Sequence, residues 1–397
     1  MELTAQYRRD RVSSIDVLRG IIMIIMALDH VRDFTHSVAI TGSPTDLVTT
    51  TAPLFFTRWI THFCAPLFVF LSGISAYLNG QKKSTAELSA FLIKRGIWLI
   101  FADIVIVSLV MSFNPLYSFI LLQVIWAIGW GMVFLGILLR GGYKLVACMG
   151  ILLFFFHNIT DYLTLPPPGP LRTLTEIFFT TPGTIIQYGN GRILLFAYAI
   201  IPWTGVLLLG YSFGRIFGKT TSPEKRRKTA LTAGLLLTAL FVLLRVVNGY
   251  GDPLPWSEQG SKVFTFLSFL NVTKYPPSLM FCCMTIGPGL VMLSLLDQWK
   301  GRLPDFLTVY GKVPFFYFVM HFFLIHLITV VLFFATGHTM AEVADPNSPF
   351  LFRPAEFGFR LRFVYLIWIA VVLLMYYPCR WYMKYKATHD QWWLSYL

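Results

Sequence analysis

Long apolar segments alternate with short polar connections along most of the chain. A helix needs about 20 consecutive apolar residues to cross the hydrocarbon core of a membrane. Ten segments approach this length, and they predict helices at residues 15–36, 60–79, 96–113, 118–139, 145–163, 193–217, 229–249, 276–296, 310–336 and 359–379. The pattern therefore predicts an all-α, polytopic integral membrane protein with about ten transmembrane helices, in which residues 1–397 form a single domain.

The composition agrees with this class of protein. Hydrophobic residues make up 56% of the chain and charged residues 13%, whereas a soluble domain carries about 25% charged residues. The net charge of +13 does not indicate nucleic-acid binding, because the basic residues lie in short loops between apolar segments and no nucleic-acid motif is present. The five cysteines lie in or beside predicted helices without metal-ligand or redox spacing, so we expect no metal site.

The distribution of basic residues predicts the orientation of the helices. An even number of helices places both termini on the same side of the membrane. If that side is the cytoplasm, 22 of the 32 lysines and arginines lie in or near cytoplasmic segments, as the positive-inside rule requires. The longer connections are then outside. Two short apolar pieces within them, residues 53–60 and 263–270, are expected to lie in the membrane interface or to cover the mouth of a site.

The first predicted helix carries many ionisable residues for a membrane segment. They are Asp16, Arg19, Asp29, His30, Arg32, Asp33 and His36. Such residues are costly at membrane depth and therefore indicate function. Arg19 and His30 are eleven residues apart, which places them within about 20° of the same helix face and roughly 16 Å apart along the axis. The simpler interpretation is that Arg19 anchors the inner end of the helix and that His30 is a hydrogen-bonded interfacial histidine.

Polar residues in other predicted helices are further candidates. His62 lies near the outer end of the second helix, at a depth that would bring it close to His30. Gln123 on the fourth helix suits interhelical hydrogen bonding. His321 lies near the middle of the ninth helix, five residues before His326, so the two rings point in different directions and do not form a metal-binding pair. A structural role for each of these side chains stays open.

Several motifs together resemble those of one family of membrane proteins. They are SIDVLRG, MALDHVRDF, THFCAPLFVFLSG, IPWTGVLLLGY, NVTKYPPSL, YGKVPFFYFVMHFFLIH and the terminal WWLSYL. In this order the chain resembles, nearly from end to end, the bacterial branch of the heparan-alpha-glucosaminide N-acetyltransferase-like membrane proteins. Related transmembrane acyltransferases carry an arginine on the first helix and a histidine eleven residues later, and Arg19 and His30 match that spacing. In the lysosomal enzyme the corresponding position is asparagine and the proposed catalytic histidine lies in the following loop, so His36 and His62 are alternatives to His30.

The resemblance implies transfer of an acyl group, expected to be acetyl, from cytoplasmic acyl-CoA to a sugar, glycan or lipid-linked acceptor on the outer face of the bacterial plasma membrane. Histidine suits this reaction because it titrates near neutral pH, either as a general base or as the carrier of the acyl group. We expect catalysis by His30, Asp29, Asp33 and His62, donor binding by Arg19, Gln123 and His321, and acceptor binding by Lys274, Tyr275, Arg58 and His36. Membrane lipid is a further expected partner, and assembly into a homo-oligomer stays open.

Two functions of other classes are consistent with the same pattern. One is a transporter or flippase for an envelope glycan or lipid precursor, in which the membrane charges move protons or ions. The other is a non-catalytic membrane partner in envelope assembly. Acyl-CoA separates these hypotheses, because an acyltransferase is stabilised by acyl-CoA and releases CoA, whereas a transporter does neither.

Overall fold

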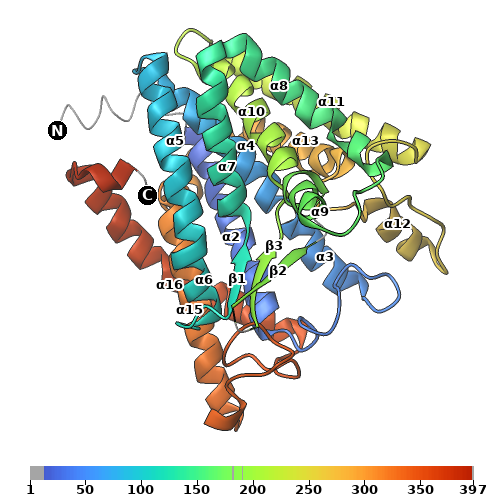
Figure 1. Cartoon of the computed structure of the whole chain (residues 1–397). Coiled ribbons are helices and arrows are strands. Elements are labelled where there is room, and N and C mark those ends of the chain that lie inside the picture. The colour runs from blue at the N-terminus through green and yellow to red at the C-terminus, as the bar shows by residue number, and fades with distance from the viewer. Residues whose placement is uncertain (1–12, 181–182, 190, 396–397) are drawn as a thin grey trace.

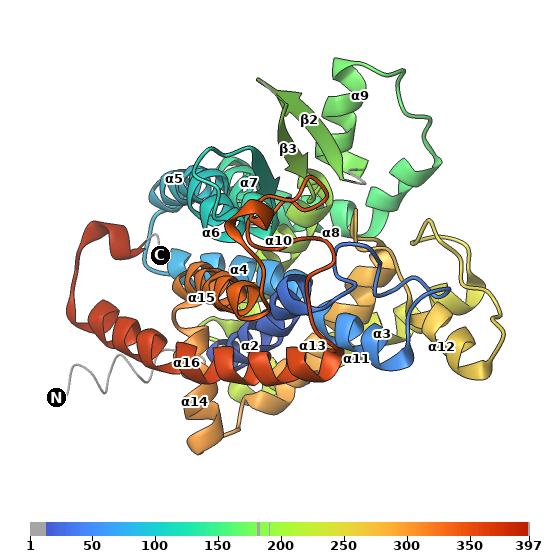
Figure 2. The same ribbon diagram turned by 90° about the horizontal axis from the view of Figure 1, so that it is seen from below.

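The computed structural model describes residues 13–180, 183–189 and 191–395, and it shows a bundle of long helices around a central one (Figure 1 and Figure 2). The long helices are α2 (Ser13–Thr35), α4 (Cys64–Gly80), α5 (Thr85–Ala102), α7 (Val124–Leu138), α8 (Tyr143–Phe156), α10 (Ile200–Phe213), α11 (Pro223–Val247), α13 (Leu279–Leu296), α15 (Pro314–Ala335) and α16 (Leu361–Thr388). The shorter helices are α3 (Ala52–Thr61), α6 (Ser108–Ser112), α9 (Pro170–Thr175), α12 (Lys262–Leu270) and α14 (Arg302–Gly311). Turns of π-helix or 3-10 helix occupy Asp103–Val107, Leu139–Gly141, His157–Tyr162, Glu176–Thr180, Gly214–Phe217, Met340–Glu342 and Trp392–Ser395.

Each of the ten predicted ranges contains helix in the structure. Within the described residues, eight helical segments are long and apolar enough to cross a membrane. The helices α2 and α5, whose charged residues are spread along the helix, are not among these eight. A mostly helical protein with several candidate membrane spans is therefore confirmed, whereas ten membrane crossings stay a prediction.

A small sheet makes the all-α prediction incomplete. The strand β1 (Phe119–Leu122) occupies the predicted start of the fourth helix, and β3 (Arg192–Phe196) occupies the predicted start of the sixth. β3 is the middle strand, and it pairs parallel with β1 and antiparallel with β2 (Thr184–Tyr188). Short apolar runs such as these are compatible with either a strand or a buried helix, so periodicity does not separate the two. The β2–β3 hairpin and α9 project beside the bundle (Figure 2).

Helix ends depart from the predictions because capping residues lie outside the apolar segments. α5 starts well before residue 96, since Ser84 and Glu87 form a capping box at its first turn. α11 starts after Ser222, whose hydroxyl accepts a hydrogen bond from the N–H of Lys225. Hydropathy therefore locates the part of a helix that suits the membrane, and the caps decide where the helix begins.

The central helix α2 is enclosed by protein: 17 of its 23 residues are buried. It packs against α3, α4, α13, α14, α15 and α16. The backbones of α2 and α14 approach so closely that only glycine fits at the contact. A Cβ at Gly20 would lie 2.0 Å from the Leu307 carbonyl oxygen, and a Cβ at Gly311 would lie 1.8 Å from the Asp16 carbonyl oxygen. Asp16, Arg19, Asp29 and Arg32 are thus surrounded by protein groups, which is the setting that such residues require at membrane depth. His30 and Asp33, which face the cavity, are partly exposed.

The peripheral helices differ from α2 in what they expose. Leu236 and Leu243 on α11 are 65% and 60% exposed, and Leu366 on α16 is 61% exposed. Large exposed leucines on one face of a long helix are unfavourable in water and suit contact with lipid chains. The exposed surface therefore supports a membrane setting independently of the composition.

Candidate functional site

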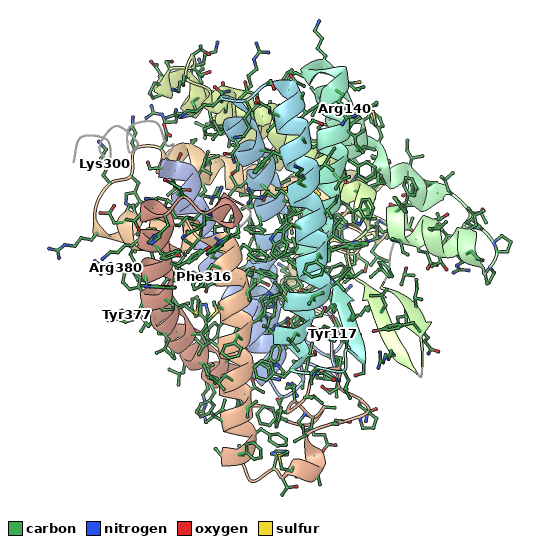
Figure 3. The ribbon with its side chains drawn as sticks, turned by 60° about the vertical axis from the view of Figure 1, so that its left-hand side comes forward. Tyr117, Arg140, Lys300, Phe316, Tyr377 and Arg380 are labelled. Carbon is green, nitrogen blue, oxygen red and sulfur yellow. The ribbon has the colours of Figure 1, made fainter. Side chains whose placement is uncertain are left out.

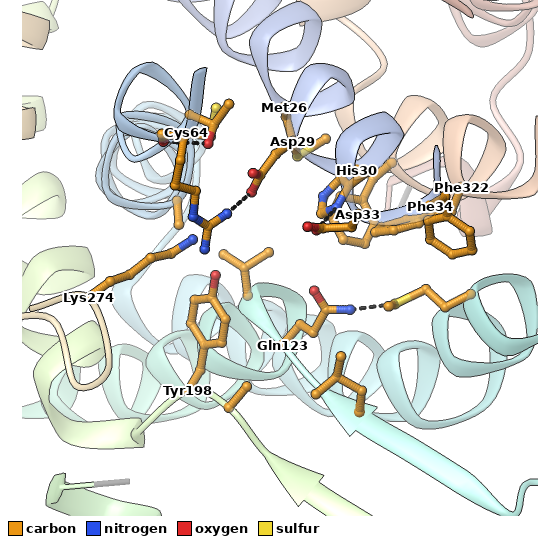
Figure 4. A pocket seen from close by; sticks show the side chains of 18 of the residues that line it. Met26, Asp29, His30, Asp33, Phe34, Cys64, Gln123, Tyr198, Lys274 and Phe322 are labelled. Atoms are coloured by element: carbon orange, nitrogen blue, oxygen red, sulfur yellow. Dashed lines mark hydrogen bonds and ion pairs between the residues drawn. The ribbon is translucent and has the colours of Figure 1, made fainter. Parts of the chain in front are cut away.

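A cavity of about 240 Å³ lies at the C-terminal end of α2. Residues of α2, α3, α4, α7 and α15, together with the connections before α7, α10 and α13, form its wall (Figure 4). Its polar and thiol-bearing lining residues are Asp29, His30, Asp33, Arg58, Thr61, Cys64, Gln123, Tyr198, Lys274 and Tyr275. All of these except Thr61, Cys64 and Tyr198 are predicted from the sequence. Residues far apart in the sequence are thus brought into one site.

The imidazole of His30 lines the cavity and lies one helical turn from the carboxylate of Asp33. Its side chain is 15% exposed, and its Nδ1 atom lies 3.8 Å from Oδ2 of Asp33. That separation is an ion-pair distance and is longer than a hydrogen bond. The rings of Phe322 and His321 pack against His30, with centroid distances of 4.2 and 5.3 Å. The packing orients the imidazole, and Asp33 lies on the Nδ1 side of the ring.

A network of charged groups surrounds His30 and ties α2 to α3. Asp29 accepts hydrogen bonds from Arg32, at 2.9 Å, and from Arg58. The dashed line at Asp29 in Figure 4 marks the second of these. Arg32 also donates to Asp33 at 2.6 Å. Because Asp33 is held by Arg32, and Arg32 by Asp29, the network determines where the carboxylate beside His30 lies.

The opposite wall carries Gln123, which directs its side chain into the cavity (Figure 4). Its amide nitrogen lies 2.5 Å from the sulfur of Met111. The backbone N–H groups of Gln123 and Trp126 donate to Oδ2 of Asp103 at 2.9 and 3.2 Å. Asp103, at the end of α5, therefore accepts the hydrogen bonds that the side chain of an N-cap residue would otherwise accept at the start of α7. Asp103 is not among the residues predicted from the sequence, although a carboxylate inside the apolar run IFADIVIV is itself a signal of function.

Asp252 organises the connection that carries Lys274 and Tyr275. Its carboxylate accepts hydrogen bonds from the backbone N–H and hydroxyl of Thr273, at 2.8 and 3.0 Å, and from the hydroxyl of Ser278, at 2.6 Å. Nζ of Lys274 lies 5.1 Å from the ring centroid of Tyr275. The two residues thus reach the cavity from a connection that is fixed at both ends.

Tyr198 is a cavity residue that the sequence analysis misses. It follows β3, and its ring packs against Trp203 and Tyr275 at centroid distances of 5.0 and 5.4 Å. Burial, with Tyr275 beside it, raises the pKa of Tyr198 well above its ordinary value. Its hydroxyl is therefore a neutral donor at physiological pH. A tyrosine in an apolar run gives no sequence signal that separates this role from packing.

Arg19 lies toward the other end of α2 and does not line the cavity. One of its terminal nitrogens donates to Asp16 at 3.2 Å and to the carbonyl of Gly311 at 3.0 Å, and the other donates to Ser75 at 2.8 Å. These bonds join α2 to α4 and to the end of α14. The geometry accounts for Arg19 as a structural link, and donor binding by Arg19 stays a prediction.

Three predicted histidines are also outside the cavity lining. His62 is buried between α3 and α4, beside the ring of Phe281. The backbone of His36 pairs with Phe359, and its side chain lines a separate small pocket. His321 is fully buried directly behind His30, with Nδ1 2.9 Å from the carbonyl oxygen of Tyr317. His321 therefore supports the ring that lines the cavity.

His326 points away from this site, as its spacing from His321 predicts. Its two ring nitrogens contact the carbonyl oxygens of Met111 and Leu351 at 2.7 and 2.8 Å. Across the described residues, no group of three or more His, Cys, Asp or Glu side chains has the arrangement of a metal site. The polar groups that line the cavity are an imidazole, two carboxylates, two cations, an amide, two phenols, a hydroxyl and a thiol.

Comparison with known proteins identifies the family of this chain. The profile described as "Heparan-alpha-glucosaminide N-acetyltransferase, catalytic" matches residues 11–245, which is more than half of the chain. The match includes His30, Arg58 and Tyr198, whereas Lys274 and His321 lie beyond it. No curated protein matches the chain. The chain therefore belongs to the heparan-alpha-glucosaminide N-acetyltransferase catalytic family, whose members are membrane acetyltransferases.

Proposed function

We propose that this protein transfers an acetyl group from acetyl-CoA to an amino or hydroxyl group of a sugar-containing acceptor, with His30 as the general base. The observation that carries the proposal is the position of His30, on the wall of a polar cavity and one turn from the carboxylate of Asp33. Imidazole is the side chain best suited to take a proton and return it within one catalytic cycle.

The proposed reaction uses His30 twice. The imidazole removes the proton from the acceptor nitrogen or oxygen as that atom attacks the thioester carbonyl. The tetrahedral intermediate then breaks the carbon–sulfur bond, and the departing CoA sulfur receives the same proton from the imidazolium. Asp33, 3.8 Å from Nδ1, stabilises the imidazolium between these steps.

We also propose that the acetyl group is transferred from the cytoplasmic side of the membrane to the outer side. Arg140 and Lys300, which the positive-inside rule assigns to the cytoplasm, lie at the same end of the bundle (Figure 3). His30 and the cavity are near the other end of α2, beyond Arg19. Acetyl-CoA would thus approach from the cytoplasmic end, and the acceptor would belong to the cell envelope on the outer face of a bacterial plasma membrane.

A direct assay tests the function. The purified full chain should release CoA from acetyl-CoA when glucosamine is added, and acetyl-CoA without acceptor should raise its thermal stability, because a ligand that binds only the folded state stabilises it. Free thiol and acetylglucosamine would be measured together, with heated protein as the control. If acetyl-CoA did not stabilise the protein and no sugar in a panel of acceptors led to thiol release, the result would contradict the proposal. It would favour a transporter.

We propose further that Arg19 contacts the donor when acetyl-CoA is bound. A guanidinium binds phosphate through two parallel hydrogen bonds, which an ammonium does not reproduce. Arg19→Lys should therefore weaken acetyl-CoA binding by about tenfold and leave acceptor binding unchanged. The affinity would be measured from the thermal stability of the protein at increasing acetyl-CoA concentrations. Arg302→Lys, an exposed arginine at the start of α14, is the matched control. Unchanged donor affinity in Arg19→Lys would leave Arg19 the structural link seen here.

A further inference from the structure

The charged groups around the cavity are balanced except for one cation. Arg32 and Arg58 both contact Asp29, and Arg32 also contacts Asp33. Lys274 lines the same cavity, and among the described residues it forms no ion pair with a carboxylate. Together with Arg32, which lies behind the cavity wall, the described residues thus place three cations beside two carboxylates, and Lys274 is the cation that makes no direct contact with either carboxylate.

The position of this charge is determined by the fold. Lys274 extends its side chain into the cavity on the same side as Tyr198 (Figure 4). Asp252 holds the preceding residue, Thr273, through both its backbone N–H and its hydroxyl. A lysine that only anchored a helix end would extend to the lipid headgroups, whereas Lys274 contributes to the wall of an internal cavity.

The neighbours of Lys274 suit a negatively charged ligand group. The guanidinium of Arg58 and the neutral phenol of Tyr198 line the same cavity and are hydrogen-bond donors. A partly buried cation without a paired carboxylate favours the binding of an anion. A ligand carboxylate or phosphate placed here would complete the network while the rest of the ligand extends toward His30.

We infer that the acceptor carries an anionic group, a carboxylate or a phosphate, which binds to Lys274 at the Arg58 end of the cavity. This inference rests on the proposed function, in which His30 deprotonates the acceptor. It adds a recognition rule: the reacting hydroxyl or amine and the anionic group lie on the same molecule. Neutral sugars then bind weakly, and the charge of the acceptor decides which sugars react.

Binding of matched sugars tests the inference without turnover. Methyl glucoside, methyl glucuronide and glucose 6-phosphate present a neutral group, a carboxylate and a phosphate, and each would be titrated against the thermal stability of the purified full chain. We expect one or both anionic sugars to stabilise the protein at a concentration about tenfold or more below that at which methyl glucoside does so. The more effective anionic sugar identifies the natural group as carboxylate or phosphate.

The variant Lys274→Met keeps much of the side-chain length and removes the charge. It should lose the preference for anionic sugars and keep its stabilisation by acetyl-CoA, which also shows that it folds. Lys262→Met, an exposed lysine at the start of α12, is the matched control and should keep the preference. In the turnover assay, wild type should have a lower KM for glucosamine 6-phosphate than for glucosamine if phosphate is the natural group, and Lys274→Met should remove that difference.

Two results would overturn the inference. One is equal stabilisation of the wild-type protein by neutral and anionic sugars, and the other is an anionic preference that persists in Lys274→Met. A protein that prefers anionic sugars but releases no CoA with any acceptor would contradict the acetyltransferase proposal and leave the anion site standing. The binding and turnover measurements therefore separate the two failures.

Discussion

Replacing His30 with alanine should lower CoA release in the presence of acceptor by roughly two to four orders of magnitude, the usual cost of removing a general base. The acceptor proton then has no imidazole to receive it, and Asp33 is held by Arg32 rather than directed at the acceptor. Acetyl-CoA should still raise the thermal stability of His30→Ala, because donor binding does not depend on the proton transfer. Stopped assays of thiol release and thermal titrations on the same preparation measure both quantities.

Three other histidine variants show whether the effect belongs to His30. His62→Ala and His36→Ala remove the alternatives that the family resemblance leaves open. His389→Ala changes an exposed histidine beyond the end of α16 and is the matched control. Near-normal turnover in His30→Ala together with loss in His62→Ala would move the catalytic role to His62 and make His30 a structural partner of Asp33.

Replacing Asp29 with asparagine should destabilise the protein by about 3–5 kcal/mol, the range found when one partner of a buried ion pair is removed. Asp29 contacts both Arg32 and Arg58, and its side chain is 10% exposed. In Asp29→Asn, Arg58 loses its carboxylate partner and Arg32 keeps only Asp33. The free energy of unfolding, measured by reversible denaturation in mixed micelles, should fall, and turnover should fall with it because Asp33 is no longer held as firmly beside His30.

A second substitution separates charge from packing in this result. The double variant Asp29→Asn with Arg58→Met removes both members of the pair, so it should recover part of the stability lost in Asp29→Asn. Glu356→Gln, at an exposed carboxylate in the connection before α16, should leave stability unchanged. Equal stability of Asp29→Asn and wild type would show that the Arg58 pair contributes little to the fold.

The helices and part of the site could be predicted because both depend on local properties of the chain. Apolar runs of sufficient length predict the membrane helices, and all ten predicted ranges contain helix. His30 and Asp33 are one turn apart on a single helix, so their proximity follows from helix geometry. The cost of ionisable residues in a membrane explains why α2 could be identified as the helix that bears the site.

Other parts of the site depend on contacts between distant segments. Arg58 reaches Asp29 only because α3 packs on α2, and Lys274 reaches the cavity only because Asp252 holds its connection. Tyr198 enters the cavity from the end of β3, a strand that hydropathy reads as the start of a helix. Spacing along the chain carries no information about such contacts.

By itself the sequence determined a multi-helix membrane protein, the helix that carries the reactive groups and the resemblance to an acetyltransferase family, since helix periodicity, hydropathy and motif order are properties of the chain. Only the tertiary structure decided that His30 lines the cavity while His36, His62 and His321 do not. It also decided that Arg32 and Arg58 neutralise Asp29 and leave Lys274 without a carboxylate partner among the described residues. The physical reason is that burial and charge pairing are set by packing between helices, which brings together side chains hundreds of positions apart.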